Sequence, residues 1–302
     1  MRRLRLLAVL IPLLLATGCG FKPEPIGSLP SFPQTVVDGL GRHVTVTAQP
    51  HRVVSLDPGL TETAFAIGAG SAVVAASGRE QYPPAAQRLP RAVAAGAAPS
   101  DARLRTLRPD LVLAPASTTA AAAAALGKAV GAPVYVASTG NLPGIEHDVD
   151  QVAALTGRAD AGHRVVRGMQ AALHDVDTAL AGTAPVPVFV DEGFFYTIEP
   201  TSTAAKLLQL AGGQNVAGSA TPGRPFPLAS LRAAAPQVYL AIQGRGVTLA
   251  GLRRTKATRT LPAVRERHFA LVDAATLADT GPRAAAEVVR LARMLHPSLH
   301  IP

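Results

Sequence analysis

Short apolar runs alternate with longer amphipathic stretches along most of the chain. Runs with the length of buried strands occur at 53–55, 72–75, 111–114, 134–136, 186–190, 238–242 and 269–272. Helical apolar patterns lie between or after them, near 60–68, 100–107, 118–130, 201–211, 228–235 and 281–295. Strands that alternate with helices are typical of βαβ units with a parallel sheet. The pattern therefore predicts an α/β fold with two Rossmann-like βαβ lobes.

The two halves of the chain resemble each other in one segment. Residues 101–114 can be laid on residues 228–241 at a constant offset of 127, with six identities in fourteen positions. Both copies consist of a helical pattern, a proline that ends it and a buried apolar run. This match favours an internal duplication.

The region between the halves contains no strand pattern. Its apolar residues recur at helical spacing from Ala159 to Ala181. A helix of that length measures roughly 35 Å, enough to run from one lobe to the other. We expect an N-terminal lobe at 34–140, a linking helix within 141–182 and a C-terminal lobe at 183–302.

The N-terminus has the pattern of an export signal. Three arginines precede the apolar run Leu6–Leu15, which is shorter than the ~20 residues that a membrane-spanning helix needs. The run leads into Leu-Ala-Thr-Gly-Cys19, which resembles a bacterial lipobox, although Ala16 stands where leucine is usual. We expect a signal peptide at 1–18, lipidation of Cys19 and a flexible Gly/Pro-rich tether at 19–33. The alternative is an ordinary signal peptide with an incidental cysteine.

The composition excludes several classes of protein. With 48% hydrophobic residues the chain is not a disordered polymer, and its single cysteine excludes a disulfide scaffold and cysteine-rich metal sites. The formal net charge is +9. The cations are mostly arginines scattered through the chain, and no run interleaves them with aromatic residues. We therefore expect no nucleic-acid partner.

Several ordered segments resemble one family. Asp38–Val46 is similar to its opening hairpin, and Arg52–Thr63 to its first strand, loop and helix start. Leu107–Val112, Leu210–Asn215 and the closing Gly-Pro-Arg and Leu-His-Pro segments match further signatures in the same order. The chain thus resembles the cobalamin and ferric-siderophore binding lipoproteins of ABC importers, over almost its whole length after the signal.

The resemblance implies a stiff two-lobed clamp outside the cytoplasm, anchored by Cys19 to the outer face of the cytoplasmic membrane. It implies that cobalamin, a ferric siderophore or haem is held between the lobes and presented to a permease of the FecCD or BtuCD kind. In open parallel sheets, ligands lie outside the carboxyl ends of the strands. The loops expected there are 55–61, 77–83, 115–119, 191–203, 243–245 and 278–283, together with Ser138.

Aromatic residues in two of these loops are candidate ligand contacts. Tyr82 lies in a polar segment before two prolines, where a similar aromatic-proline loop borders the family's cleft. Phe194, Phe195 and Tyr196 follow a predicted strand in a chain that is only 4% aromatic. Large amphipathic rings contribute contact area at little entropic cost. We predict ligand contacts from Tyr82, Phe195 and Tyr196, with one aromatic of the triplet packed into the core.

Arginines in the same loops are candidate anion ligands. Arg79, Arg245 and Arg283 are the predicted contacts, with Arg91 and Arg224 as further candidates. Bidentate arginine bonds would suit haem propionates or a ferric siderophore. Each of these arginines could equally be a solvated surface residue. The arginines favour an anionic chelate, whereas the closing segments favour cobalamin.

The chain shows no catalytic or metal-binding pattern. It has no G-x-S-x-G, H-E-x-x-H or P-loop motif, and its eight histidines lack metal-site spacing. His147 with Asp148 and Asp150 is interpreted as a solvated helix start, and His296 as the end of the last helix. We expect no enzyme activity, no cofactor and no bound metal ion.

Two alanines depart from the family pattern. The family usually has an acidic residue on each lobe, seven positions before the helix-ending proline, for docking to arginines of the permease. Ala102 and Ala229 occupy these positions. They place permease docking in doubt and motivate an alternative function, a monomeric adaptor or sensor lipoprotein with the same fold. Otherwise we expect a monomeric importer subunit.

Overall fold

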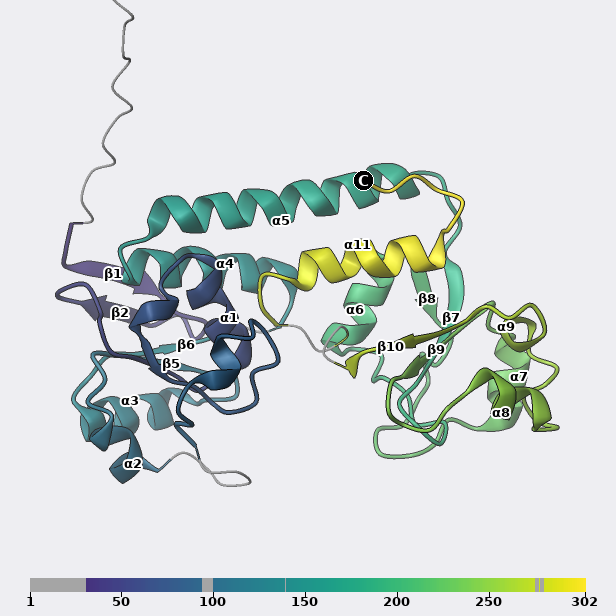
Figure 1. The fold of residues 1–302 in the computed structure, drawn as a ribbon, viewed down its shortest axis with the longest axis horizontal. Helices are drawn as coiled ribbons and strands as arrows, with labels where there is room; N and C mark the ends of the chain where they lie inside the picture. The colour runs from purple at the N-terminus through teal and green to yellow at the C-terminus, as the bar shows by residue number, and fades with distance from the viewer. Residues whose placement is uncertain (1–30, 94–99, 139, 275–276, 278–279) are drawn as a thin grey trace, which may run out of the picture. The chain divides into compact units, whose positions relative to one another are not determined.

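The computed structural model describes residues 31–93, 100–138, 140–274, 277 and 280–302 (Figure 1). The predicted signal peptide, Cys19 and most of the predicted tether lie outside the described residues. Among the described helices, none combines the length and apolar character that a membrane crossing needs.

A short hairpin precedes the first sheet. It consists of the antiparallel strands β1 (Gln34–Val37) and β2 (His43–Val46). Asp38 closes the turn between them, because its carboxylate accepts hydrogen bonds from the backbone of Leu40 and Arg42 and pairs with the Arg42 guanidinium. The hairpin expected from the family resemblance is therefore present.

The first sheet is parallel, with strand order β4-β3-β5-β6. Its strands are β3 (Val53–Ser55), β4 (Val73–Ala75), β5 (Leu111–Ala114) and β6 (Val134–Val136). Its helices are α1 (Pro58–Ala66), α2 (Asp101–Thr106) and α3 (Ala120–Val130), with short 3-10 turns at Gly70–Ala72 and Ala86–Arg88. Every residue of β5 is buried, as expected for a strand covered on both faces.

The second sheet is also parallel, with strand order β10-β9-β7-β8. Its strands are β7 (Val186–Asp191), β8 (Gly213–Asn215), β9 (Val238–Ile242) and β10 (Phe269–Val272). Its helices are α6 (Thr203–Leu210), α7 (Leu228–Ala234), α8 (Leu249–Arg254), α9 (Pro262–Arg265) and α11 (Ala284–Leu295).

The two sheets have the same topology. In chain order each sheet places its second strand at one edge, then its first, third and fourth strands. The segments matched in the sequence are equivalent in this scheme, since α2 and β5 correspond to α7 and β9. The topology therefore agrees with an internal duplication.

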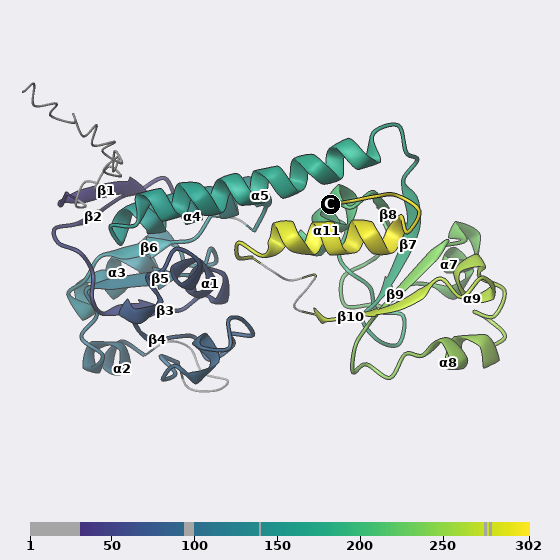
Figure 2. The same ribbon diagram turned by 45° about the horizontal axis from the view of Figure 1, so that its top comes forward.

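Two helices connect the halves. These are α4 (Leu142–Leu155) and α5 (Ala159–Leu180), which pack along each other, and α5 also packs on α11 of the second half (Figures 1 and 2). Gly157 has a φ of 68° between the two helices, a left-handed conformation that glycine adopts without a steric penalty. α5 ends one residue before the end of its predicted range.

The buried apolar residues form three clusters. The largest includes Leu60 and Leu113 of the first half together with Val190 and Leu291 of the second half. A second cluster lies under α2 and α3, and a third lies under α7, α8 and α9. Each sheet is therefore covered on both faces, and the carboxyl ends of its strands remain for loops.

Candidate functional site

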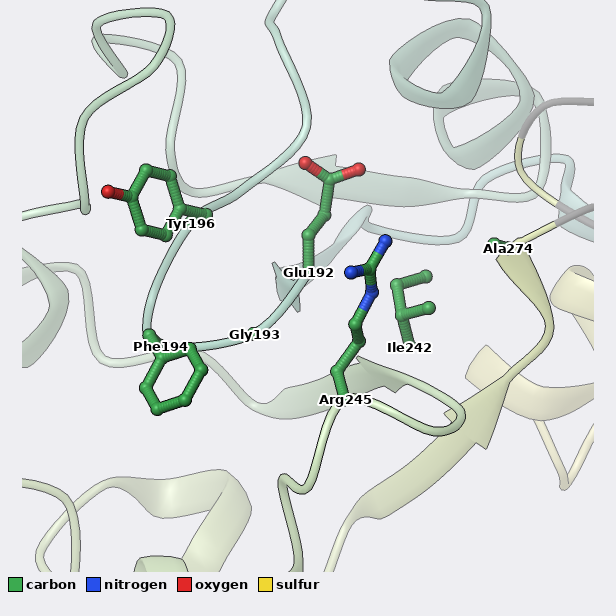
Figure 3. Close-up of a pocket in the computed structure, with 7 residues that line it drawn as sticks. All are labelled: Glu192, Gly193, Phe194, Tyr196, Ile242, Arg245 and Ala274. Carbon is green, nitrogen blue, oxygen red and sulfur yellow. The ribbon is translucent and has the colours of Figure 1, made fainter. Parts of the chain in front are cut away.

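The loops after three strands of the second sheet surround an open hollow (Figure 3). One part has a volume of about 360 Å³ and is lined by Glu192, Gly193, Phe194, Tyr196, Ile242, Arg245 and Ala274. An adjoining part of about 480 Å³ shares Glu192, Ile242 and Ala274 and adds Ile198, Glu199, Ser202, Thr203, Ala204 and Leu277. These residues follow β7, β9 and β10 at their carboxyl ends, where the sequence predicted the ligand loops.

A tight turn presents the aromatic residues to this hollow. The backbone N–H of Tyr196 donates to the carbonyl of Gly193 at 3.0 Å, which closes a turn with Phe194 and Phe195 at its centre. Both central residues have positive φ, 53° and 65°. A turn of this kind usually contains asparagine and glycine, and an L-residue pays roughly 1–2 kcal/mol for the left-handed conformation. Strain of this size in an exposed turn points to a functional role.

Asp191, the last residue of β7, holds the turn in place. One of its carboxylate oxygens, Oδ1, accepts hydrogen bonds from the backbone N–H groups of Gly193 at 2.8 Å and Phe195 at 3.1 Å. The other oxygen accepts the Tyr239 hydroxyl at 2.5 Å. Burial raises the pKa of the Asp191 carboxyl, and the hydrogen bonds from Tyr239, Gly193 and Phe195 act in the opposite direction. The pair of Asp191 and Tyr239 therefore offsets part of the strain in the turn.

Gly193 lets the arginine loop approach the turn. Its φ is 113°, and a Cβ at this position would lie 3.2 Å from the Cβ of Arg245. Figure 3 shows the Arg245 and Glu192 side chains extending to the same side of the loop. The hollow is thus lined by acidic, cationic and aromatic groups together.

The corresponding loops of the first half are held by two carboxylates, the buried Glu80 and the half-buried Asp57. Glu80 accepts hydrogen bonds from the backbone of Ser77 and Gly78 and from the Ser77 hydroxyl at 2.7 Å. Asp57 caps α1 by accepting from the backbone N–H of Leu60. Burial raises the pKa of Asp57, and the Leu60 hydrogen bond and the positive charge of Arg79 oppose this shift. Arg79 itself is exposed.

Tyr82 and Arg283 lie together. The Arg283 guanidinium carbon lies 4.2 Å from the centre of the Tyr82 ring, within the range of a cation–π contact. Arg283 also donates to Glu62 of α1 through its backbone N–H at 2.8 Å and its Nε at 2.9 Å. Glu62 is buried, which raises the pKa of its carboxyl, whereas the bonds from Arg283 lower it. Arg283 therefore joins the two halves of the chain.

The predicted site residues fall into different surroundings. Tyr196 and Arg245 line the hollow, whereas Phe195 is half-buried against the core cluster under α7 to α9. Two aromatics of the triplet are exposed, Phe194 with 82% of its surface accessible and Tyr196 with 41%. Arg91 and Arg224 are exposed and do not line the hollow.

The interpretation of the His147 segment is wrong. Asp148 is buried in the middle of α4, where it accepts the Tyr135 hydroxyl at 2.7 Å and the backbone N–H and hydroxyl of Ser138. His147 Nε2 lies 2.9 Å from the carbonyl oxygen of Val37. The helix starts five residues earlier than His147, at Leu142, because Asn141 caps it. The sequence pattern could not show which polar residues of an amphipathic helix face the sheet.

Several residues of the site were not predicted. Glu192 and Glu199 line the hollow, and Asp191 and Glu62 organise the loops. A signal for Asp191 existed, because an acidic residue ends a buried strand three positions before the aromatic triplet. Within the described residues, no group of three or more His, Cys, Asp or Glu side chains is arranged to hold a metal ion.

Comparison with known proteins places the chain among binding proteins. A family profile described as periplasmic binding protein matches residues 53–276. A vitamin B12-binding protein of Yersinia pseudotuberculosis serotype O:1b (strain IP 31758) is 27% identical over 195 residues, 64% of this chain and 69% of that protein. A cobalamin-binding protein of Halobacterium salinarum (strain ATCC 29341 / DSM 671 / R1) is 28% identical over 65% of this chain and 54% of its own length.

A solved structure agrees with these matches. The periplasmic heme-binding protein BhuT, in complex with two hemes, superposes with a TM-score of 0.71 and 28% sequence identity. The superposition covers 83% of this chain and 99% of BhuT.

Proposed function

Because the chain belongs to the periplasmic binding protein family, we propose that it captures a metal chelate and delivers it to an ABC permease. The chelate classes are cobalamin, haem and ferric siderophores, with cobalamin as the first candidate. The ligand is held between an N-terminal lobe at 34–140 and a C-terminal lobe at 183–302. The protein acts by binding and release, without catalysis.

The strained aromatic turn is the observation that supports this proposal. Phe194 is exposed in a conformation that costs free energy, beside a hollow at the carboxyl ends of parallel strands. An exposed aromatic ring contributes most when a large flat ligand covers it. A tetrapyrrole-type chelate provides such a face.

The charges in the hollow favour cobalamin over haem. Glu192 and Glu199 line it, and Arg245 is the cation among its described lining residues. Cobalamin presents neutral amides around its ring, whereas haem presents two carboxylates that carboxylates of the protein would repel. Arg245 is the observation that supports haem as the second candidate, since it could pair with one propionate.

We infer an extracytoplasmic location from the family, with Cys19 as the lipid anchor. Docking to the permease would have to use residues other than the family's acids. Ala102 on α2 and Ala229 on α7 are both exposed. We propose a monomer that engages the permease through other groups of these surfaces.

An absorbance titration tests the function. The compact unit from Ser31 to Pro302 includes every strand and helix described above and its own core, so it is the fragment to use. We expect saturable binding of cobalamin, and weaker binding of haem and of a panel of ferric siderophores. The chain has no tryptophan, so ligand absorbance is the better signal. No binding to any of them would contradict the proposal and favour the adaptor or sensor function.

Tyr82→Ala tests whether the first lobe contacts the same ligand. The ring is 44% exposed and covers the Arg283 guanidinium. We expect cobalamin affinity to fall by at least about 1 kcal/mol, with little change in melting temperature, since one exposed contact is lost. Titration and thermal melting of the same sample measure both quantities. An unchanged affinity would remove Tyr82 from the site.

A further inference from the structure

One long stretch of the second half contains no acidic residue. Between Glu199 and Glu266 the chain has nine lysines and arginines and neither aspartate nor glutamate. The cations are scattered through this stretch as they are elsewhere, but here no acidic residue accompanies them. Such a stretch would carry a large share of the protein's excess positive charge.

Six of these cations lie on helices α7, α8 and α9 or on the loop between α8 and α9. Helices α7, α8 and α9 cover one face of the second sheet, with Leu231, Leu252 and Val264 buried in a common cluster. Figures 1 and 2 show the three helices grouped beside β9. Their exposed side chains and the loop between α8 and α9 form what we call the basic face: Arg232, Arg253, Arg254, Lys256, Arg259 and Arg265.

Among the described residues, the cations of the basic face have no acidic partner. Over the described residues, no ion pair or side-chain hydrogen bond joins any of the six to another group of the chain. Glu266, the acid next to α9, lies 3.8 Å from His268. Like charges that share a surface repel one another, so the face gains most from an anionic partner outside the protein.

The spacing of the cations and the lack of exposed aromatic residues on the basic face indicate which kind of anionic partner it can bind. Its cations are spread over three helices, and the aromatic residues within 200–265, Phe226 and Tyr239, are buried. Single-stranded nucleic acid would require exposed aromatic platforms for its bases. A broad array of long, exposed arginines matches the diffuse charge of a lipid headgroup layer, to which each cation contributes independently. We propose that the basic face binds the surface of a bilayer that contains anionic phospholipids.

Vesicle sedimentation tests this proposal on the compact unit from Ser31 to Pro302, which lacks the predicted lipid anchor. We expect binding to vesicles of phosphatidylglycerol and phosphatidylcholine, and none to phosphatidylcholine alone. Binding should weaken as salt is raised, because exposed charges are screened. Changing Arg253, Arg254, Lys256 and Arg259 together to glutamine should weaken it more than about 100-fold, since each cation contributes about fivefold.

A matched variant changes the same number of cations elsewhere. Arg88, Lys128, Arg164 and Arg167 are also three arginines and one lysine, all exposed and outside the basic face. Their joint change to glutamine should leave most of the vesicle binding intact. An equal loss of vesicle binding in both variants would mean that binding depends on net charge alone, and this would overturn the proposal that the basic face binds the bilayer. Binding to immobilised polyglutamate without sedimentation on phosphatidylglycerol would assign the face to an acidic protein instead.

The vesicle assay is independent of the ligand site. Cobalamin binding should be unchanged in both fourfold variants, because none of the eight residues lines the hollow. A failure of the titration with intact vesicle binding would contradict the proposed function alone. Intact cobalamin binding without vesicle binding would contradict the basic face alone.

Discussion

Replacing Phe194 by glycine is expected to weaken cobalamin binding by about 2 kcal/mol without destabilising the protein. The ring is 82% exposed, so its loss removes little packing from the folded state. Glycine also relieves the left-handed strain at φ 53°, worth about 1–2 kcal/mol, and loses about 0.5–1 kcal/mol through the entropy of the unfolded chain. The free energy of unfolding should therefore stay constant or rise by up to about 1.5 kcal/mol. Absorbance titration and urea denaturation measure the two effects.

A control for this variant exists in the other half of the chain. Arg108 is also exposed and has a φ of 47°, and it lies outside the hollow. Arg108→Gly should give a similar change in unfolding free energy and leave ligand affinity unaltered. If Phe194→Gly binds cobalamin as tightly as the unchanged protein, the aromatic turn has no role in recognition.

Asp191→Ala is expected to destabilise the protein by about 3 kcal/mol and to weaken ligand binding by about as much as Phe194→Gly does. The change leaves the Tyr239 hydroxyl and two backbone N–H groups without their acceptor. Tyr239 is fully buried, so its hydroxyl cannot turn to water without opening the core. The turn would then relax from its left-handed conformation and withdraw Phe194 from the hollow. Urea denaturation gives the stability, and titration below the unfolding transition gives the affinity.

A change at Asp148, a buried carboxylate of the first half, separates the loss of stability from the loss of ligand affinity. Asp148 accepts a tyrosine hydroxyl and a backbone N–H in the same manner as Asp191. It does not line the hollow. Asp148→Ala should therefore cost a similar unfolding free energy while the folded protein keeps its affinity. A parallel loss of affinity in both variants would mean that Asp191 acts only through global stability.

Most strands could be predicted because each buried strand is a continuous apolar run. Residues 53–55, 111–114, 134–136 and 238–242 were placed with the correct bounds. β8 was missed because Gly-Gln-Asn has no apolar pattern. It is an edge strand that pairs only with β7. α9 was missed because it spans only four residues, too few for a helical period to be visible.

The site could be predicted in position but only partly in detail. Parallel strands place their following loops at one edge, so the turn after β7 and the loop after β9 were expected together. Which phenylalanine is exposed could not be read from the sequence, because Phe195 packs against the core cluster under α7 to α9 while Phe194 stays exposed. The partner of Arg283 could not be foreseen, because Glu62 is 221 positions away in the chain.

Local patterns in the sequence were enough to predict the α/β class, the repeated alternation of strands and helices, and the loops that surround the hollow. These depend on local periodicity and on short chain signals such as prolines and caps, which act between neighbouring residues. Only the folded structure shows which carboxylates are buried, which aromatic residues line the hollow and which cations share a surface. Those properties arise where segments distant in the chain meet. There, burial and hydrogen bonding depend on the position of every surrounding element rather than on residue type.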